Sequence, residues 1–295
     1  MIDEQIQTMQ MQGTTVADQW YHAKDLRITA IDAHAHVFVR GLPLAQQRRH
    51  APDYDATVDA YAAHLLSNGV SHAVLVQPSF LGTDNSFFLD VAKRYPRRFR
   101  GVAVVDCAVT DHELALLNSA GVVGIRLNLV GLRLPQLTAP DWQQLFARAN
   151  ALGWHVEVHR EAVDLHAVVG PLLEQGCTVV VDHFGRPDPR AAADDPGFQY
   201  LLSLAATGRV WVKLSAAYRS APNDDGMALG TSLTSQILDT YTPDRLVWGS
   251  DWPHTQHQQN VDYAATRRAL DQWVPDVAQR ESILTSSART LYRFE

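Results

Sequence analysis

The sequence has few cysteines, no long apolar run and no excess of positive charge, and each absence excludes a class of protein. The two cysteines among 295 residues, Cys107 and Cys177, lie in or beside apolar segments without metal-ligand spacing. We therefore expect both to be buried packing residues in a reducing compartment. No apolar run approaches the roughly 20 residues that cross a bilayer, and the N-terminal residues lack a signal-peptide pattern. A cytoplasmic protein without membrane contact is the expectation.

Acidic residues outnumber basic ones, 32 to 25, and the formal charge is −7. This balance argues against binding of nucleic acid through a broad basic surface, so an anionic ligand has to be bound by a few local cations. The hydrophobic share of 46% is typical of a globular protein with a large interior. The sequence leaves the oligomeric state open, a homodimer included.

Short apolar, β-branched segments alternate with segments of helical periodicity from Ile28 onward. Strict alternation of this kind favours a parallel sheet, and eight repeats without a dinucleotide-binding glycine motif favour a closed barrel. We predict a single-domain α/β protein, a (β/α)8 TIM barrel over residues 28–295, with a short polar N-terminal extension over residues 1–27 that frays or wraps the barrel. The predicted strands are Ile28–Phe38, Ala73–Ser79, Gly101–Asp106, Val122–Val130, His155–Glu161, Thr178–Gly185, Val210–Ala216 and Leu246–Asp251. The predicted helices are Thr57–Asn68, Asn85–Tyr95, His112–Ala120, Asp141–Leu152, Ala162–Gln175, Phe198–Thr207, Ser232–Tyr241, Tyr263–Trp273 and Glu281–Phe294.

Histidines lie at the ends of three predicted strands, where a barrel of this class has its active site. Side chains two apart on a strand point the same way, so we expect His34 and His36 to project together toward the barrel mouth, with Asp32 deeper on that face. His159 and His183 end the fifth and sixth strands. Neutral imidazoles bind a divalent metal or polarise a carbonyl oxygen. His159 or His183 taken alone fits an interior histidine equally well, whereas the set of four histidines favours a functional site.

Asp251 ends the eighth predicted strand. A carboxylate there is costly to bury unless it is paired or used, so we predict a general base that takes a proton from water and returns it to a leaving oxygen. The alternative is a capping or salt-bridged aspartate. The sequence leaves open whether the protein holds no metal or one divalent ion, zinc above all. The residues that could hold such an ion are His34, His36, His159, His183 and Asp251.

Arginines at strand ends and in the following loops predict a small anionic ligand. Guanidinium groups bind carboxylates in bidentate fashion, and Arg126 stands out because its neighbours in sequence are apolar. Lys213, on the seventh strand, is expected to be an interior salt-bridge partner with no chemical role. The predicted ligand-binding residues are Arg126, Arg133, Arg219, Ser79, His159 and Asn128.

Five strand-end motifs together resemble the 2-pyrone-4,6-dicarboxylate lactonase group of the amidohydrolase superfamily, over about residues 31–294. They are Asp32–Phe38 (DAHAHVF), Gly82–Asn85 (GTDN), Gly124–Asn128 (GIRLN), Asp182–Pro187 (DHFGRP) and Trp248–His254 (WGSDWPH). The resemblance implies a hydrolase that opens the ester bond of a carboxylated cyclic lactone, with Asp251 activating water. It further implies that His34, His36 and His183 polarise the carbonyl and that Arg126, Arg133, Arg219 and Ser79 hold carboxylates.

The resemblance also implies hydrolysis without a divalent metal, and one residue departs from that pattern. His159 stands where the group has a tyrosine, which restores a histidine that metal-dependent relatives use as a ligand. Other functions therefore stay open: a sugar-acid or sulfomuconolactone lactonase, or a metal-dependent decarboxylase, on the same scaffold. A non-catalytic barrel that binds an anionic metabolite is the alternative from another class, and the presence of Asp251 disfavours it.

Overall fold

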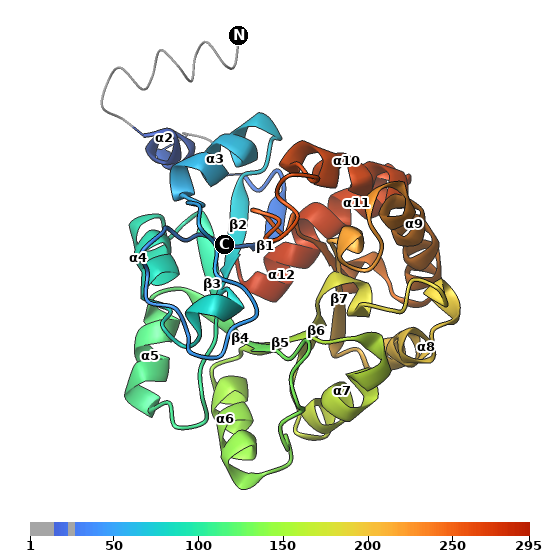
Figure 1. Ribbon diagram of the computed structural model, residues 1–295, viewed down its shortest axis with the longest axis horizontal. Coiled ribbons are helices and arrows are strands. Elements are labelled where there is room, and N and C mark those ends of the chain that lie inside the picture. Colours follow the sequence, from blue (N-terminus) through green and yellow to red (C-terminus); the bar gives the residue numbers. More distant parts are fainter. Residues whose placement is uncertain (1–14, 23–26) are drawn as a thin grey trace.

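The computed structural model describes residues 15–22 and 27–295, and its centre is a barrel of eight parallel strands in the order β1 to β8 (Figure 1). The barrel is nearly closed, because a parallel bridge joins Ala35 to Trp252 beyond the end of β8. This architecture confirms the predicted (β/α)8 fold, and each strand overlaps its predicted segment. The strands are β1 (Ile31–Ala35), β2 (His72–Val76), β3 (Phe99–Ala103), β4 (Val122–Asn128), β5 (His155–His159), β6 (Val179–Val181), β7 (Val210–Leu214) and β8 (Leu246–Trp248).

Helices between the strands cover the outside of the barrel (Figure 1). Polar side chains fix where several of them begin: at α5, Thr110 accepts a hydrogen bond from the Glu113 N–H, and the Glu113 carboxylate accepts one from the Thr110 N–H. The α-helices are α2 (Val16–His22), α3 (Val58–Ser67), α4 (Ser86–Arg94), α5 (Asp111–Ser119), α6 (Pro140–Ala151), α7 (Leu165–Glu174), α8 (Pro196–Ser203), α9 (Asn223–Thr240), α10 (Tyr263–Trp273), α11 (Val277–Ser282) and α12 (Ala288–Tyr292). Short 3₁₀ turns are η1 (Ser79–Leu81), η2 (Ala162–Asp164), η3 (His183–Gly185), η4 (Ala192–Asp194), η5 (Leu204–Thr207), η6 (Ala217–Arg219) and η7 (Pro243–Arg245).

Two apolar clusters hold these layers together. The larger one lies between the barrel and its helices, and the smaller one fills the amino-terminal end of the barrel. In the smaller cluster, Ala288, Tyr292 and Phe294 from the last helix and the residues after it meet side chains near the strand starts, such as Val123 and Val247. The C-terminal segment therefore forms the floor of the barrel, and the opposite end is left for the loops that follow the strands.

The N-terminal extension contains a helix that the sequence analysis did not predict. Trp20 of α2 is buried, its Nε1–H donates to the Val70 carbonyl at 3.0 Å, and its ring lies 5.0 Å from that of Phe99. This part of the extension thus wraps the barrel. Residues 1–14 and 23–26 of the extension lie outside the described residues, and the predicted boundary at residue 28 stays a prediction.

Asp32 does not share the inner face with the two histidines that follow it, which corrects the expected alternation. The register of β1 on β2 shifts between Asp32 and Ala35, and such a bulge breaks the strict period of two. The buried Asp32 carboxylate instead accepts hydrogen bonds from the Tyr61 hydroxyl of α3 and the Ser250 N–H, each at 2.8 Å. It therefore ties β1 to α3 and to the end of β8.

Helix α9 begins nine residues before its predicted start at Ser232, because glycine lowers helix propensity and two glycines obscured its first half. A Cβ at Gly230 would lie 2.5 Å from the Trp273 ring, so the glycine allows α9 and α10 to pack closely. The predicted helix at residues 281–294 is divided by a π turn, η8 (Ile283–Ser287), between α11 and α12. Cys177 is buried as expected, but Cys107 is half-buried because it lies in the loop after β3.

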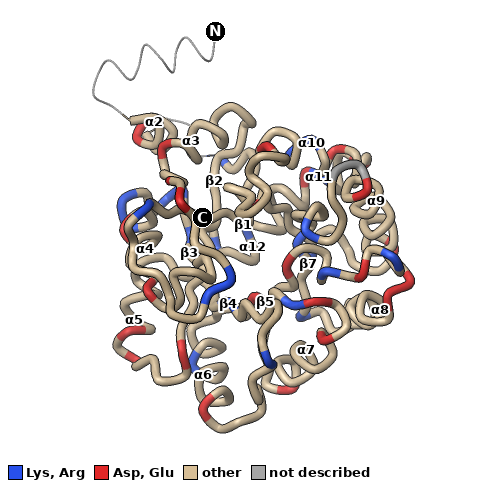
Figure 2. Tube along the Cα trace, viewed as in Figure 1, with Lys and Arg blue, Asp and Glu red and all other residues tan. Residues whose placement is uncertain are grey.

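No helix among the described residues is both long enough and apolar enough to cross a membrane. The distribution of charged residues differs between the outer helices and the barrel mouth. Acidic and basic positions are scattered over the outer helices, while basic positions also gather around the barrel mouth near the ends of β4, β5 and β7 (Figure 2).

His72, the first residue of β2, makes stability depend on pH. Its side chain is 3% exposed, and burial, with the charges of Arg98 and Arg100, lowers its pKa from 6.5 to about 4. As the pH falls below 6.5 the unfolded chain binds the proton first, so stability is lost between pH 6.5 and about 4. We expect His72→Gln to remove about 2 kcal/mol of the decrease in unfolding free energy between pH 7 and pH 5. Urea denaturation at both pH values measures it, with exposed His112→Gln as the control; an unchanged pH dependence would refute the assignment.

Candidate active site

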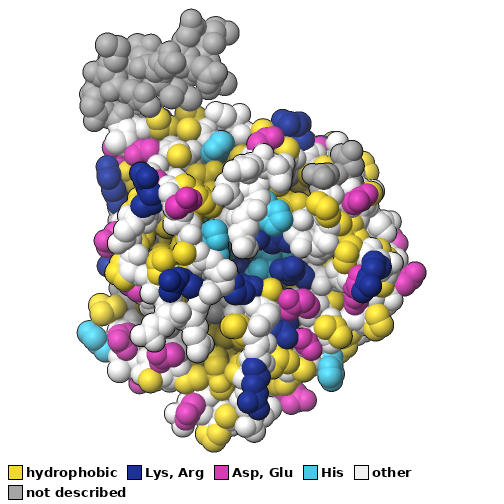
Figure 3. All heavy atoms as spheres, viewed as in Figure 1, with side chains coloured by type: hydrophobic (Ala, Val, Ile, Leu, Met, Phe, Trp, Pro, Cys, Tyr) yellow, Lys and Arg dark blue, Asp and Glu magenta, His cyan; other side chains and the backbone are white. Residues whose placement is uncertain are grey.

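A pocket of about 110 Å³ lies at the carboxyl ends of the strands and collects most of the predicted site residues. Figure 3 shows histidine and basic side chains around this hollow over the centre of the barrel. His34 is fully buried and contacts the pocket residue Asp251, whereas Arg133 is exposed and does not line the pocket. The predicted residues that line the pocket are His36, Ser79, Arg126, Asn128, His159, His183, Arg219 and Asp251.

Asp251 has one carboxylate oxygen without a partner. Its Oδ2 accepts hydrogen bonds from the Tyr218 hydroxyl at 2.5 Å and from Arg219 Nε at 2.6 Å, while its buried Oδ1 has no hydrogen-bond partner in the described part of the chain. Burial alone would raise the pKa of Asp251, but the Arg219 charge outweighs it and holds this pKa well below its usual range. The group is therefore ionised at neutral pH and has an unused acceptor.

Three histidines turn one ring nitrogen each toward this oxygen. The Nε2 atoms of His34 and His36 lie 3.8 Å from Asp251 Oδ1, and that of His183 lies 3.9 Å from it. Burial lowers the pKa of His36 to about 4 and that of His183 to about 3, and it lowers the pKa of His34 well below its usual value. All three rings are therefore neutral at pH 7 and act as hydrogen-bonding groups rather than as cations.

The opposite ring nitrogens indicate which Nε2 atoms carry a proton. His36 Nδ1 lies 2.7 Å from the Val76 carbonyl, which only accepts hydrogen bonds, so Nδ1 is protonated and Nε2 keeps a free lone pair. His34 Nδ1 lies 2.9 Å from Lys213 Nζ, which only donates, and 3.4 Å from Asp182 Oδ1, which only accepts. We assign the lone pair to Nδ1 on the shorter of the two contacts, and the proton therefore to Nε2. The first strand thus supplies one acceptor and one donor to the pocket.

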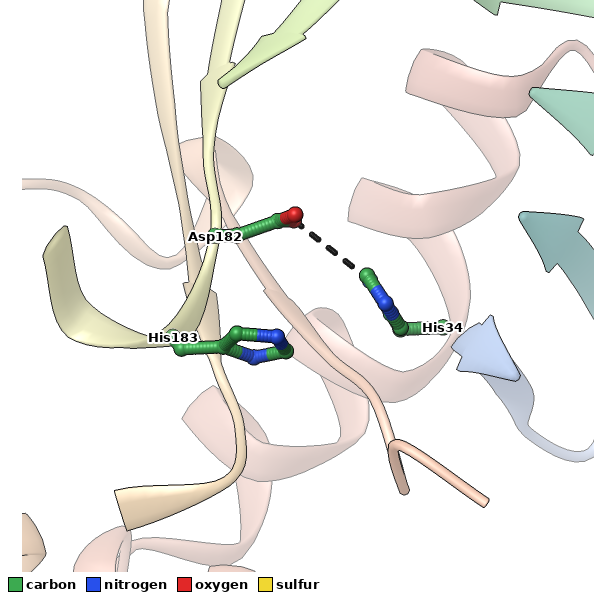
Figure 4. Close-up of side chains that lie close together, drawn as sticks. All are labelled: His34, Asp182 and His183. Atoms are coloured by element: carbon green, nitrogen blue, oxygen red, sulfur yellow. Dashed lines mark ion pairs between the residues drawn. The ribbon is translucent and has the colours of Figure 1, made fainter. Parts of the chain in front are cut away.

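A buried network of charges lies around His34. Lys213 Nζ is 2.5 Å from Glu157 Oε2 and 3.2 Å from Asp182 Oδ1, and Arg126 Nη2 is 3.0 Å from Asp182 Oδ2. Figure 4 shows His34 and Asp182 facing each other, with His34 Nδ1 3.4 Å from Asp182 Oδ1. Despite the effect of burial, the charges of Lys213 and Arg126 hold the pKa of Asp182 well below its usual range. Lys213 is the interior salt-bridge partner that the sequence predicted.

Left-handed backbone holds two of the strand ends in place. Residues 183–186 have φ angles of 53°, 57°, 74° and 50°, and Asp251 has a φ of 60°. For residues other than glycine this conformation costs about 1–3 kcal/mol each, and it persists where neighbours enforce it, most often at functional sites. The Asp251 N–H donates to the His34 carbonyl at 2.8 Å, so β1 fixes the orientation of Asp251.

Two arginines to which the sequence analysis gave no role line the same pocket. Arg49 lies in the loop between β1 and α3, and its Nη2 donates to Asn128 Oδ1 at 2.7 Å. Arg186 follows η3, and its Nη1 lies 3.5 Å from His159 Nε2. The signal for Arg186 was its place three residues after the strand-end His183, whereas the loop of Arg49 has no periodicity that would place it.

The donor set of the pocket fits a single divalent metal ion. His34, His36 and Asp251 offer ligand atoms within 4.8 Å of one another, and the unpartnered Asp251 Oδ1 is an oxygen that such an ion would use. Nearby positive charge opposes tight binding, because Arg126 Nη2 lies 3.5 Å from His34 Nε2 and Arg219 already pairs with Asp251. His159 lies apart from these ligand atoms, with Nδ1 3.3 Å from Arg126 Nη2.

Histidines and an aspartate at the strand ends of a (β/α)8 barrel define a class of hydrolytic barrels. A family model for amidohydrolases matches residues 31–294, and the chain belongs to this family. It is 32% identical to a 2-pyrone-4,6-dicarboxylate hydrolase of Comamonas testosteroni, over 89% of this chain and 90% of that protein. It is 28% identical to a 4-sulfomuconolactone hydrolase of Hydrogenophaga intermedia, over 88% of each.

A solved structure shows the same fold at higher identity. It is that of a candidate 2-pyrone-4,6-dicarboxylic acid hydrolase of Acinetobacter baumannii with citric acid bound. The two chains are 38% identical with a TM-score of 0.87, over 90% of this chain and all of the other. The resemblance to the pyrone dicarboxylate lactonase group is thereby confirmed.

Gly249 leaves the space that His34 occupies. A Cβ at residue 249 would lie 2.6 Å from His34 Cβ and 3.0 Å from its backbone nitrogen. We expect Gly249→Ala to displace His34, to lower turnover at least about tenfold and to reduce the free energy of unfolding by about 1–3 kcal/mol. Steady-state kinetics and urea denaturation measure the two effects. Gly170→Ala on α7 is the matched control, since its Cβ would lie at an ordinary 3.5 Å from the Tyr200 hydroxyl; wild-type turnover in Gly249→Ala would contradict the assigned fit.

Proposed function

We propose that this protein hydrolyses the ester bond of a cyclic lactone that carries carboxylates, of the 2-pyrone-4,6-dicarboxylate kind. One observation carries the proposal: a buried, ionised Asp251 with an unpartnered oxygen faces neutral imidazoles in a pocket lined by arginines. Family membership and lactone hydrolases among its relatives make the chain a hydrolase that acts on ester bonds. Carboxylates on the substrate agree with the arginines, and citric acid in the Acinetobacter structure is an anion of the same chemistry.

The attacking water is held by two acceptors. Asp251 Oδ1 and His36 Nε2 lie 3.8 Å apart and both have a free lone pair, so one water molecule can donate a hydrogen bond to each. Its oxygen lone pair then points to the lactone carbonyl carbon. As the carbon–oxygen bond forms, Asp251 Oδ1 takes a proton from the water, which is general base catalysis by a positioned carboxylate.

The developing oxyanion is stabilised by donors on the other side of the carbonyl. His34 Nε2 carries a proton, and we assign a second donor to His183 Nε2, with the Ser215 hydroxyl, 2.7 Å from His183 Nδ1, donating to that nitrogen. When the tetrahedral intermediate collapses, the bond between the carbonyl carbon and the ring oxygen breaks. Asp251 returns its proton to that oxygen, and the ring opens to a carboxylic acid, which releases its own proton to the solvent and leaves a free carboxylate.

The low pKa of Asp251 in the free protein is compatible with this role. A base works best when its pKa lies near the working pH, and Arg219 is the main charge that lowers the pKa of Asp251. A bound substrate carboxylate shares the positive charge of the pocket and adds negative charge beside Asp251. Both effects raise the pKa of Asp251 in the complex.

The remaining pocket residues shape the substrate site. We propose that Arg126, Arg219, Ser79, Asn128 and His159 contact the substrate from the pocket wall, where each of them lies. No substrate contact is assigned to Arg133 because it is exposed outside that wall. The cytoplasm remains our proposal for the location of the protein, and it rests on the sequence composition alone.

Asp251→Asn removes the proton acceptor and keeps the shape of the side chain. We expect its kcat to fall by about 10²–10⁴, with little change in the affinity for a dicarboxylate. Proton release from a panel of pyrone dicarboxylate, sulfonated muconolactone and sugar-acid lactone measures the rate and identifies the substrate. Decarboxylation would instead consume a proton and release carbon dioxide. Asp188→Asn, at an exposed ion pair with Arg190, is the control, and wild-type turnover in Asp251→Asn would end the assigned role.

A divalent ion held by His34, His36 and Asp251 would polarise the lactone carbonyl, but we propose that the protein's own donors suffice. The reason is the charge of Arg126 and Arg219 beside these ligands. Turnover is expected to survive treatment with a chelator and extensive dialysis, with less than one zinc ion per chain by elemental analysis. Stoichiometric zinc whose removal abolishes turnover, and whose return restores it, would overturn this proposal.

A further inference from the structure

The pocket arginines fall into two kinds. Arg126 Nη2 lies 3.0 Å from Asp182 Oδ2, and Arg219 Nε lies 2.6 Å from Asp251 Oδ2. Their charge is matched by carboxylates of the protein, which accept hydrogen bonds from Nε and Nη2 of Arg126 and from Nε of Arg219. These two groups are therefore less available for a bidentate bond to a substrate carboxylate.

Among the described residues, Arg49 and Arg186 form no ion pair with a carboxylate, and only the more distant Glu161 carboxylate acts on both charges. Within the described residues, neither lies within 4.0 Å of a carboxylate oxygen. Arg49 Nη2 donates to the Asn128 amide oxygen at 2.7 Å, and Arg186 Nη2 donates to the Arg219 backbone carbonyl at 3.2 Å. Arg186 Nε–H is buried and has no acceptor among the described residues, which is unfavourable unless a ligand supplies one. Both residues line the pocket; Arg186 is half-buried and Arg49 is exposed.

The backbone conformation fixes the position of Arg186 beside the pocket. It ends the run of left-handed residues that starts at His183, with a φ of 50° for Arg186 itself. The same strained turn therefore directs His183 toward Asp251 and Arg186 toward His159. Strain of this kind at a pocket indicates a functional demand on the orientation of the side chain.

We propose that Arg49 and Arg186 form a two-arginine clamp that selects a lactone with two carboxylates, one for each unmatched guanidinium. This inference rests on the proposed function and assigns its specificity to residues different from the strand-end arginines. Asn128 positions Arg49 across the pocket through its amide oxygen. The histidines and Asp251 then face the ester carbonyl, while the clamp holds the carboxylates.

The clamp is tested by calorimetric binding of pyridine-2,4-dicarboxylate, a planar dianion that cannot be hydrolysed. Arg49→Met and Arg186→Met are each expected to raise its Kd by about tenfold to a hundredfold, the loss of a charge-assisted bidentate bond. The matched controls are Arg48→Met and Arg190→Met, exposed arginines outside the pocket, which are expected to bind within twofold of wild type. Arg186→Lys and Arg49→Lys keep the charge but lose the fork, and both are expected to bind more weakly than wild type and more tightly than the methionine variants.

Kinetics separate the clamp from the reaction. In both methionine variants KM for pyrone dicarboxylate is expected to rise at least tenfold, and kcat/KM is expected to fall at least tenfold more for the dicarboxylate than for its neutral dimethyl ester. Wild-type affinity for the dianion in both Arg49→Met and Arg186→Met overturns the clamp, and the proposed function stands if these variants still release acid from the lactone. If the wild-type protein hydrolyses no carboxylated lactone, the proposed function fails, and the binding of the dianion still decides on the clamp. Urea midpoints near that of wild type show that the variants are folded.

Discussion

Among the described residues, the carboxylates buried in the interior of this barrel are those of Glu157, Asp182 and Asp251, and the structure depends on how their charge is matched. Glu157 and Asp182 are paired by Lys213 and Arg126, and Asp251 is paired by Arg219. Each charge would be costly to bury alone. The ion pairs between these residues therefore hold strands β4 to β7 and the segment after β8 together. The positive charges in turn help keep the neighbouring histidines neutral.

That neutrality determines the chemistry of the pocket. A protonated imidazole can only donate hydrogen bonds, whereas a neutral one offers a donor and an acceptor whose positions its second nitrogen decides. Val76 and Lys213 set opposite tautomers for two histidines two residues apart on one strand. One strand end thereby supplies both a group that orients water and a group that stabilises negative charge.

The fold and the centre of the site could be predicted from sequence, because alternating strands and helices bring all strand ends to one face wherever the loops go. His34, His36, His183 and Asp251 are strand-end residues and meet for that reason. Arg49 belongs to an aperiodic loop, and its position depends on a hydrogen bond to a distant asparagine, which no local pattern encodes. Asp32 was misplaced because a bulge changes the side on which a residue lies without leaving a trace in the alternation of the sequence.

The C-terminal segment that forms the floor of the barrel affects how the ligand specificity of such a protein can change in evolution. Ala288, Tyr292 and Phe294 pack into the end of the barrel opposite the pocket, so the apolar contacts that stabilise the strands are physically separate from the loops that meet the ligand. Mutations in those loops can alter which molecule is accepted while leaving this packing intact. Mutations that change which lactone is accepted can thus occur at one end of the barrel without lowering the free energy of unfolding that packing at the other end provides.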